Sequence, residues 1–283
     1  MHTTNESGIS AAPIAAAKIG QAFERARQQG RGALIPYFMC GYPSAEQTVK
    51  LVLAAIEGGA DIIELGLPFS DPLADGPTVQ HAGHIALERG MTMRGCMEIA
   101  GQIAERTTTP LLFMGYYNPL LTYGLERFCA DASRHGVSGL IIPDLPAEEA
   151  GPLLDAARQY GLSLVFLIPP TTPDERIQRI VEVASRQHHS FIYCVSLSGV
   201  TGARDHLQVY LRDFVTRVRS YTRDSGLPLA VGIGLSRPEH IAEVTTYADG
   251  AVVGSAIINL LDTLPEHERP EAVRHFIQRL IAG

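Results

Sequence analysis

The chain has 283 residues, of which 46% are hydrophobic and 19% charged, and its net charge is −7 at pH 7. This length fits one large α/β barrel or two smaller domains. The negative charge and the lack of Lys/Arg blocks interleaved with aromatic residues argue against a nucleic-acid partner. No run of about 18 apolar residues occurs, which argues against a membrane-spanning helix.

The first 13 residues are small and polar and lack the basic lead and apolar block of a secretory signal. We therefore expect residues 1–13 to form a flexible tail and residues 14–283 to form one catalytic domain. None of the cysteines has C-x-x-C spacing, which favours reduced thiols and a cytoplasmic location. The cysteines are Cys40, Cys96, Cys129 and Cys194.

Short apolar, β-branched runs alternate with amphipathic helical patterns along most of the chain, which is typical of a parallel sheet built from strand–helix units. Eight such runs with no linker between them favour a single (β/α)8 TIM barrel over a doubly wound sheet. The expected strands are Ala33–Met39, Asp61–Leu65, Pro110–Met114, Gly139–Ile142, Ser163–Ile168, Phe191–Val195, Leu229–Gly232 and Gly250–Val253.

Helical patterns precede and follow the first expected strand. An extra N-terminal helix, expected over Ala15–Gln29, could cover the bottom of the barrel, and a second is expected over Ala45–Gly58. The Gly58-Gly59 pair, the His135-Gly136 pair and Gly161 are expected to end helices with a positive φ before the next strand.

The segment from Asp61 to Gln80 carries the most chemical information, because loops after barrel strands hold the active site. Side chains alternate along a strand, so Ile62 and Glu64 share one face. If the other face packs beneath the helices, Glu64 points into the barrel mouth. There, loss of water raises its pKa and suits it to proton transfer. The alternative is a structural carboxylate at the edge of the barrel.

The loop that follows contains two aspartates held between prolines and a glycine, so it has little conformational freedom. We interpret Asp71 as a turn or helix-capping residue. Asp75 is the better candidate for catalysis, because two carboxyl groups in separate environments can divide the acid and base roles.

Two glycine-containing turns follow the last two expected strands, Val231–Gly234 and Val253–Ile257. The amides of Gly234, Gly254 and Ser255 could bind a phosphate at the start of a short helix after strand eight. Ordinary turns, with Ser255 as a plain N-cap, are the alternative.

The residues from Glu64 to Pro77, which read ELGLPFSDPLADGP, closely resemble the signature of the tryptophan synthase alpha subunit family. The resemblance extends from Ile35–Tyr37 through Ser196–Gly202 to Gly254–Ile257. It implies a carbon–carbon lyase of tryptophan biosynthesis that cleaves indole-3-glycerol phosphate into indole and glyceraldehyde 3-phosphate. It also implies no cofactor in this chain and an alpha2-beta2 assembly whose beta subunit carries pyridoxal phosphate and receives the indole.

The same resemblance suggests roles for the site residues. Asp75 would accept the indole N–H, and Glu64 would protonate indole C3 and remove the glycerol hydroxyl proton. Tyr193 matches a tyrosine that contacts the catalytic Glu, although a core tyrosine is an alternative interpretation. Tyr37 replaces a common Phe in the pocket wall, and Gly202 belongs to the phosphate motif.

Ser196–Arg204, after the sixth expected strand, is rich in small residues and resembles the family loop that closes over substrate. We predict that Thr201 then meets Asp75. The chain departs from common family residues at four positions: Tyr37, Leu197 where Arg is frequent, Ile233 where some relatives carry an aromatic residue, and Tyr42 where Asp is frequent. Segments around Asp71 and Asn118-Pro119 resemble regions that face the beta subunit.

Three alternatives remain open from the sequence. A stand-alone indole-glycerol phosphate lyase would share the fold and both carboxylates but release indole without a partner. A sugar-phosphate isomerase barrel would use Glu64 to abstract a carbon-bound proton. A barrel that only activates a partner would not need Glu64 or Asp75.

Overall fold

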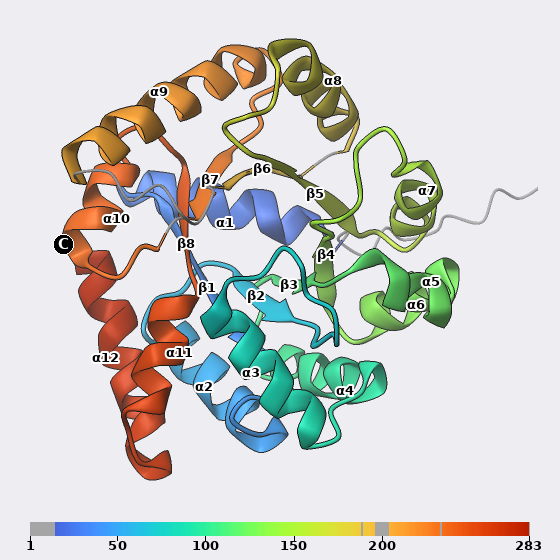
Figure 1. Ribbon diagram of the computed structural model, residues 1–283, viewed down its shortest axis with the longest axis vertical. Helices are drawn as coiled ribbons and strands as arrows, with labels where there is room; N and C mark the ends of the chain where they lie inside the picture. Colours follow the sequence, from blue (N-terminus) through green and yellow to red (C-terminus); the bar gives the residue numbers. More distant parts are fainter. Residues whose placement is uncertain (1–14, 188, 196–203, 233, 283) are drawn as a thin grey trace, which may run out of the picture.

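The structure is a computed structural model that describes residues 15–187, 189–195, 204–232 and 234–282. Its eight parallel strands form a closed barrel in sequence order, surrounded by helices (Figure 1), which confirms the predicted (β/α)8 fold. The strands are β1 (Ala33–Met39), β2 (Ile63–Gly66), β3 (Leu111–Met114), β4 (Val137–Ile141), β5 (Ser163–Ile168), β6 (Ile192–Val195), β7 (Leu229–Gly232) and β8 (Gly250–Val253).

The helices follow the strands as expected. They are α1 (Ala17–Gln28), α2 (Ala45–Glu57), α3 (Pro77–Glu88), α4 (Met93–Ala104), α5 (Tyr117–Tyr123), α6 (Leu125–Arg134), α7 (Gly151–Gln159), α8 (Asp174–Ser185), α9 (Arg204–Thr222), α10 (Pro238–Val244), α11 (Ser255–Asp262), the 3-10 turn η1 (Glu266–Glu268) and α12 (Arg269–Ala282). Within the described part of the chain, no helix is long and apolar enough to cross a membrane. The predicted tail, residues 1–13, lies outside the described residues.

The predicted helix ends are mostly correct. Gly59, Gly136 and Gly161 have φ values of 106°, 81° and 70°, a region that glycine adopts without steric cost. Gly58 differs, because it ends α2 with a helical φ of −71° and leaves the reversal to Gly59.

The N-terminal helix α1 closes the bottom of the barrel, as expected. Its buried residues Ile19 and Phe23 share a hydrophobic cluster with residues at the bottom of the barrel such as Ile62 and Phe191, which immediately precede β2 and β6. The Phe23 and Phe191 rings lie 5.3 Å apart. In Figure 1, α1 lies behind the strands, at the end of the barrel away from the loops that follow them.

The alternation of side chains along β2 determines which way Glu64 points. Ile62 belongs to the cluster inside the barrel, whereas Ile63 and Leu65 belong to the outer cluster that packs beneath the helices. Glu64 therefore lies on the inner face, as the sequence predicted.

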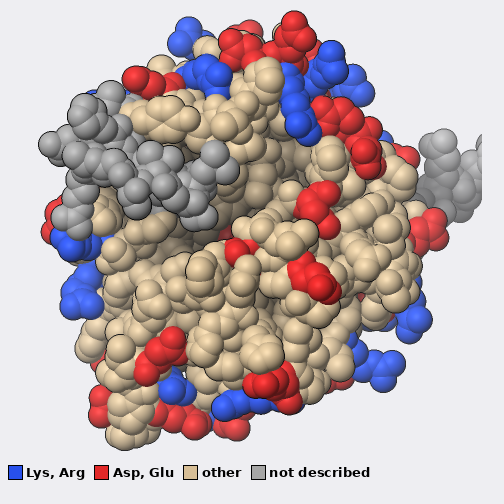
Figure 2. All heavy atoms as spheres, in the orientation of Figure 1, with Lys and Arg blue, Asp and Glu red and all other residues tan. Residues whose placement is uncertain are grey.

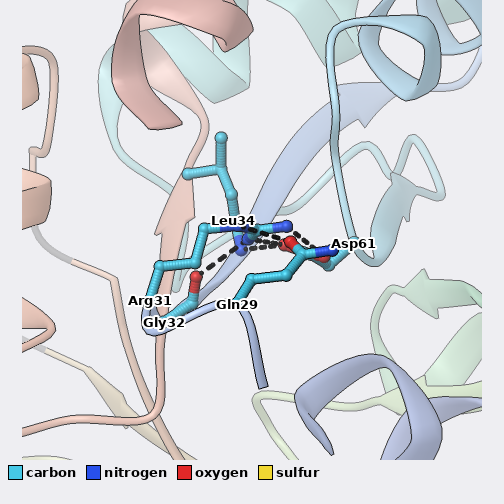
Figure 3. Close-up of polar contacts among 5 residues, drawn as sticks. All are labelled: Gln29, Arg31, Gly32, Leu34 and Asp61. Carbon is cyan, nitrogen blue, oxygen red and sulfur yellow. Dashed lines mark hydrogen bonds and ion pairs between the residues drawn. The ribbon is translucent and has the colours of Figure 1, made fainter. Parts of the chain in front are cut away.

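A partly buried ion pair joins the turn before β1 to the segment before β2 (Figure 3). The Arg31 guanidinium donates to both carboxylate oxygens of Asp61, at 2.6 and 2.9 Å. Asp61 also accepts the Leu34 N–H at 2.9 Å, and its own N–H donates to the Leu34 carbonyl at 3.0 Å. This second use of the carboxylate explains why β2 begins at Ile63 and not at Asp61 as predicted.

The same arrangement recurs before β8. Asp249 accepts the Leu229 N–H at 2.7 Å, donates its own N–H to the Leu229 carbonyl at 2.7 Å, and pairs with Arg219 at 2.6 Å. An Asp held by an Arg thus ties two adjacent strands at two places in the barrel.

We expect Asp61→Ala to lower the free energy of unfolding by about 2–4 kcal/mol, because it leaves the part-buried Arg31 guanidinium and the buried Leu34 N–H without their partner. Urea unfolding would measure the midpoint and the slope. Asp155→Ala is the control, because Asp155 is 81% exposed and pairs with Arg158 at 3.9 Å. A loss at Asp61 no larger than the control's would contradict a stabilising role for the pair.

Candidate active site

A cavity of about 1030 Å³ opens at the end of the barrel that carries the loops after the strands. Figure 2 shows this face with a hollow near its centre. Seven of the nine expected site residues line the cavity: Tyr37, Glu64, Asp75, Tyr193, Gly234, Gly254 and Ser255. The other two, Thr201 and Gly202, lie outside the described residues, as do Leu197 and Ile233.

Glu64 lies deep in this cavity. Its neighbours in the barrel register are Tyr37 on β1 and Leu112 on β3. The side chain is 1% exposed, and Oε2 has no hydrogen-bond partner among the described residues. Burial, followed by the negative charge of Asp75, raises the pKa of Glu64 to about 8. At neutral pH this carboxyl therefore holds a proton that it can donate.

Asp75 lies on the loop between β2 and α3. The Asp75 N–H donates to the Pro72 carbonyl at 3.1 Å, and Gln80 Nε2 donates to the Asp75 carbonyl at 2.9 Å. Burial raises the pKa of Asp75 to about 6, and a hydrogen bond from Tyr116 opposes this rise. Asp75 is therefore the more acidic of the two carboxyl groups, and between about pH 6 and about pH 8 it is mainly ionised while Glu64 is mainly protonated.

Sequence reasoning missed Tyr116, which lies just after β3. Its hydroxyl accepts the Ala74 N–H at 2.9 Å and donates to the Asp75 carboxylate. Its ring packs against Phe69, with ring centroids 5.3 Å apart. The one available signal was the position of Tyr116 at the end of a strand, on the face of the barrel where active sites lie.

Tyr37 on β1 and Tyr193 on β6 both contribute to the cavity wall. Each phenol lies over a glycine of the neighbouring strand, where a Cβ would come within 2.0 Å of Tyr37 Oη at Gly66 and within 2.4 Å of Tyr193 Oη at Gly232. Burial raises the pKa of both tyrosines well above the ordinary value, so both stay neutral. Tyr193 also belongs to the interior cluster, so the catalytic and the core interpretations of this residue are compatible.

Residues of the loops after β7 and β8, among them Gly234, Gly254 and Ser255, line one corner of the cavity. Gly254 is the N-cap of α11 and Ser255 is its first residue, so Ser255 is not the N-cap considered in the sequence analysis. Gly234 has φ of 38°, a conformation that glycine adopts at no steric cost. Ser236, which was not predicted, also lines this corner. A helix start with small residues is suited to bind a phosphate.

The cavity wall between the carboxyl groups and this corner is mostly apolar. Its described residues include Met114, Ile142, Phe166, Leu167 and Val252. A flat aromatic ring can bind against such a wall while a phosphate lies in the corner.

The predicted turn role of Asp71 agrees with the structure, because its carbonyl accepts the Leu73 N–H at 3.0 Å, whereas the alternative role as a helix cap is wrong. Asp71 is exposed and its carboxylate contacts the Ser70 hydroxyl, whereas Gly76 is the N-cap of α3. Tyr42 is 5% exposed and its hydroxyl bonds to Asp262 of α11. Tyr42 thus joins the loop after β1 to α11.

A family model described as "Tryptophan synthase alpha chain" matches residues 23–280. The chain belongs to the tryptophan synthase alpha chain family. It is 49% identical over 267 residues to the tryptophan synthase alpha chain of Chloroflexus aggregans, which covers 94% of this chain and 97% of that protein. It is also 42% identical to tryptophan synthase of Saccharomyces cerevisiae, again over 94% of this chain but only 37% of the yeast protein.

Solved structures agree with this assignment. Tryptophan synthase from M. tuberculosis in a ligand-free form matches with a TM-score of 0.82 and 32% identity, over 93% of this chain and 97% of that chain. The tryptophan synthase alpha subunit of Legionella pneumophila matches with a TM-score of 0.83 and 31% identity, over 94% and 97%. The tryptophan synthase alpha chain is a lyase that cleaves indole-3-glycerol phosphate in tryptophan biosynthesis and pairs with a beta chain.

We expect Tyr116→Phe to move the acidic limb of the kcat/KM pH profile upward by about one pH unit, because a hydrogen bond that favours ionised Asp75 is lost. The alkaline limb should not move. Indole release measured from pH 5 to 9 would test this, with the neighbouring Tyr117→Phe as the control. Since both enzymes act on the same phosphorylated substrate, its own ionisation cancels in the comparison. An unmoved acidic limb would show that Tyr116 does not affect the ionisation of Asp75.

Proposed function

We propose that Glu64 and Asp75 are the catalytic residues with which this chain cleaves indole-3-glycerol phosphate. The observation that supports this most strongly is the contrast between the two carboxyl groups. Glu64 is fully buried and has a pKa of about 8, whereas Asp75 is partly buried, contacts Tyr116 and has a pKa of about 6. Between these values one group is mainly protonated while the other is mainly ionised, as a reaction that needs both an acid and a base requires.

The chemistry assigns each group a step. Indole becomes a leaving group only after its C3 is protonated and the ring has tautomerised to an indolenine. Glu64 donates that proton, and the Asp75 carboxylate accepts the ring N–H and stabilises the positive charge on nitrogen. The Glu64 carboxylate then removes the proton of the glycerol hydroxyl next to the breaking bond. The C–C bond breaks, its electrons return to the indole ring, and the aldehyde of glyceraldehyde 3-phosphate forms.

The rest of the cavity would bind the substrate. The amides of Gly234, Gly254 and Ser255 would hold the phosphate at the start of α11, and Tyr37 and Tyr193 would flank the indole ring. The predicted contact between Thr201 and Asp75, and the phosphate-binding role of Gly202, remain predictions because both residues lie outside the described part of the chain.

We further propose that the chain works in the cytoplasm, with residues 14–283 as its catalytic unit, in an alpha2-beta2 assembly whose beta chain carries pyridoxal phosphate. The yeast match supports a partner, because that tryptophan synthase has a long region beyond the part that resembles this chain. The loop between β2 and α3 also presents Leu73 at 94% exposure, an apolar side chain that a partner could cover.

The alternative of a stand-alone lyase can be tested directly. Indole release from indole-3-glycerol phosphate would be measured with the isolated chain and after addition of the beta chain. We expect slow turnover alone and at least a tenfold increase with the partner. Fast turnover alone, with no increase, would favour the free lyase, and no turnover in either case would contradict the proposed function.

We expect Glu64→Gln to reduce kcat by about 10²–10⁴-fold or more, because Gln cannot transfer the proton. Binding of the phosphorylated substrate should persist, since the phosphate corner is unchanged. Single-turnover indole release and equilibrium binding would separate the two effects. Glu105→Gln, on an exposed residue, is the control.

The same substitution should stabilise the fold. The pKa of Glu64 is about 8 in the folded chain, against 4.5 for an ordinary Glu, so the folded state binds the proton more tightly. Stability therefore falls as pH rises from about 4.5 to about 8, and Gln removes this loss. We expect Glu64→Gln to gain about 1–2 kcal/mol at pH 8 and little below pH 4.5. A variant less stable than the parent at pH 8 would show that Glu64 is not destabilised by burial.

A further inference from the structure

The cavity mouth carries mainly negative charge, although its substrate is a phosphate ester. Among the described residues that line the cavity, Asp75 and Asp144 are acidic, Glu64 lies deeper and holds its proton at neutral pH, and Arg176 is the only Lys or Arg. In Figure 2, acidic side chains lie close to the hollow, and basic and acidic side chains are mixed above it. With a net charge of −7, the chain as a whole repels an anion.

Arg176 is on the first turn of α8, at the rim of the cavity. Its guanidinium pairs with Glu148, with Nε 3.2 Å from Oε1 and Nη2 3.5 Å from Oε2. No contact of Nη1 is found within the described residues. The Arg176 and Glu148 side chains are 49% and 40% exposed. An ion pair this exposed contributes little to stability, so its Arg can exchange one anionic partner for another.

The backbone beneath Arg176 is held in place from the neighbouring helix α9. Arg217 donates from Nη2 to the carbonyls of Pro170 and Thr172, at 2.7 and 3.2 Å. Thr172 is buried, and its N–H donates to the Pro169 carbonyl at 3.0 Å. The segment that leads into α8 is thus fixed, whereas the Arg176 side chain is 49% exposed at the rim and is held only by its pair with Glu148.

We infer that Arg176 guides the phosphate of the incoming substrate to the cavity mouth. At physiological ionic strength a charge acts over roughly 8 Å, so one cation at the rim affects an approaching phosphate more than the distant net charge does. A phosphate monoester carries about 1.5–2 negative charges near pH 7, and a guanidinium can bind two of its oxygens at once. Glu148 opposes this attraction, because it competes for the same guanidinium.

In this role Arg176 is a positioning residue that does not touch the reacting atoms. The inference rests on the phosphorylated substrate of the proposed function. It predicts an effect on kcat/KM that depends on salt, with kcat unchanged, because a charge at the rim alters capture of the substrate and not the chemical steps.

The test compares Arg176→Gln with Arg179→Gln and Glu148→Gln, each in the full chain with saturating beta chain. Arg179 is the matched control, because it is exposed on the same helix, does not line the cavity and causes the same change in net charge. At about 20 mM salt we expect Arg176→Gln to lower kcat/KM roughly three- to tenfold and to leave kcat within about twofold. The loss should vanish near 0.5 M salt.

The other two variants are expected to raise kcat/KM or to leave it unchanged. Glu148→Gln should raise kcat/KM at low salt, since Arg176 loses its competing partner, and Arg179→Gln should match the parent. Inorganic phosphate, used as a competitive inhibitor, should bind more weakly to Arg176→Gln alone.

Several outcomes would overturn the inference. They are equal effects of Arg176→Gln and Arg179→Gln, a loss that does not depend on salt, or a loss confined to kcat. If the parent enzyme itself does not cleave indole-3-glycerol phosphate, the proposed function fails instead, so the two failures are distinguishable.

Discussion

The removal of one carboxyl group from water is the constraint on which the site depends. Glu64 lies deep inside the closed barrel, at the bottom of the cavity, and its side chain is only 1% exposed. A charge buried without a partner is costly, so the group keeps its proton to a much higher pH than in solution. The protein gives up stability to do this, since no described donor satisfies Glu64 Oε2. A buried polar atom left without a partner at a strand end is more consistent with catalysis than with a structural role.

The second carboxyl group differs because it lies on a loop and not on a strand. Asp75 is partly exposed at the mouth, and the Tyr116 hydroxyl donates to it while accepting the Ala74 N–H. The two acids therefore have different pKa values although they line one cavity. The difference comes from where the chain places each group, because the barrel interior excludes water and the loop brings a hydrogen-bond donor.

The repeated features of the fold could be predicted from the sequence. The periodicity of apolar residues located all eight strands. The alternation of Ile62, Ile63 and Leu65 correctly predicted that Glu64 points into the barrel. Residues whose role depends on a distant partner could not be found in this way. Nothing in the sequence near Tyr116 indicates that its hydroxyl reaches the loop after β2, and nothing near Asp61 indicates Arg31. The start of β2 shifted by two residues, from Asp61 to Ile63, where the Asp61 side chain accepts a backbone N–H of β1.

The two Asp–Arg pairs lie on either side of β1, the strand at which the barrel closes. Asp61 binds the backbone of Leu34 in β1, and the Asp249 carbonyl accepts the Ala33 N–H from the same strand. Strands β1 and β8 are the two pairing strands most distant in sequence, so joining them costs more chain entropy than any other step of sheet formation. The two Asp side chains thus flank this seam, because Asp61 joins β1 to β2 and Asp249 joins β8 to β7. They also lie at the end of the barrel opposite the mouth, so assembly of the fold and chemistry on the substrate depend on separate sets of side chains.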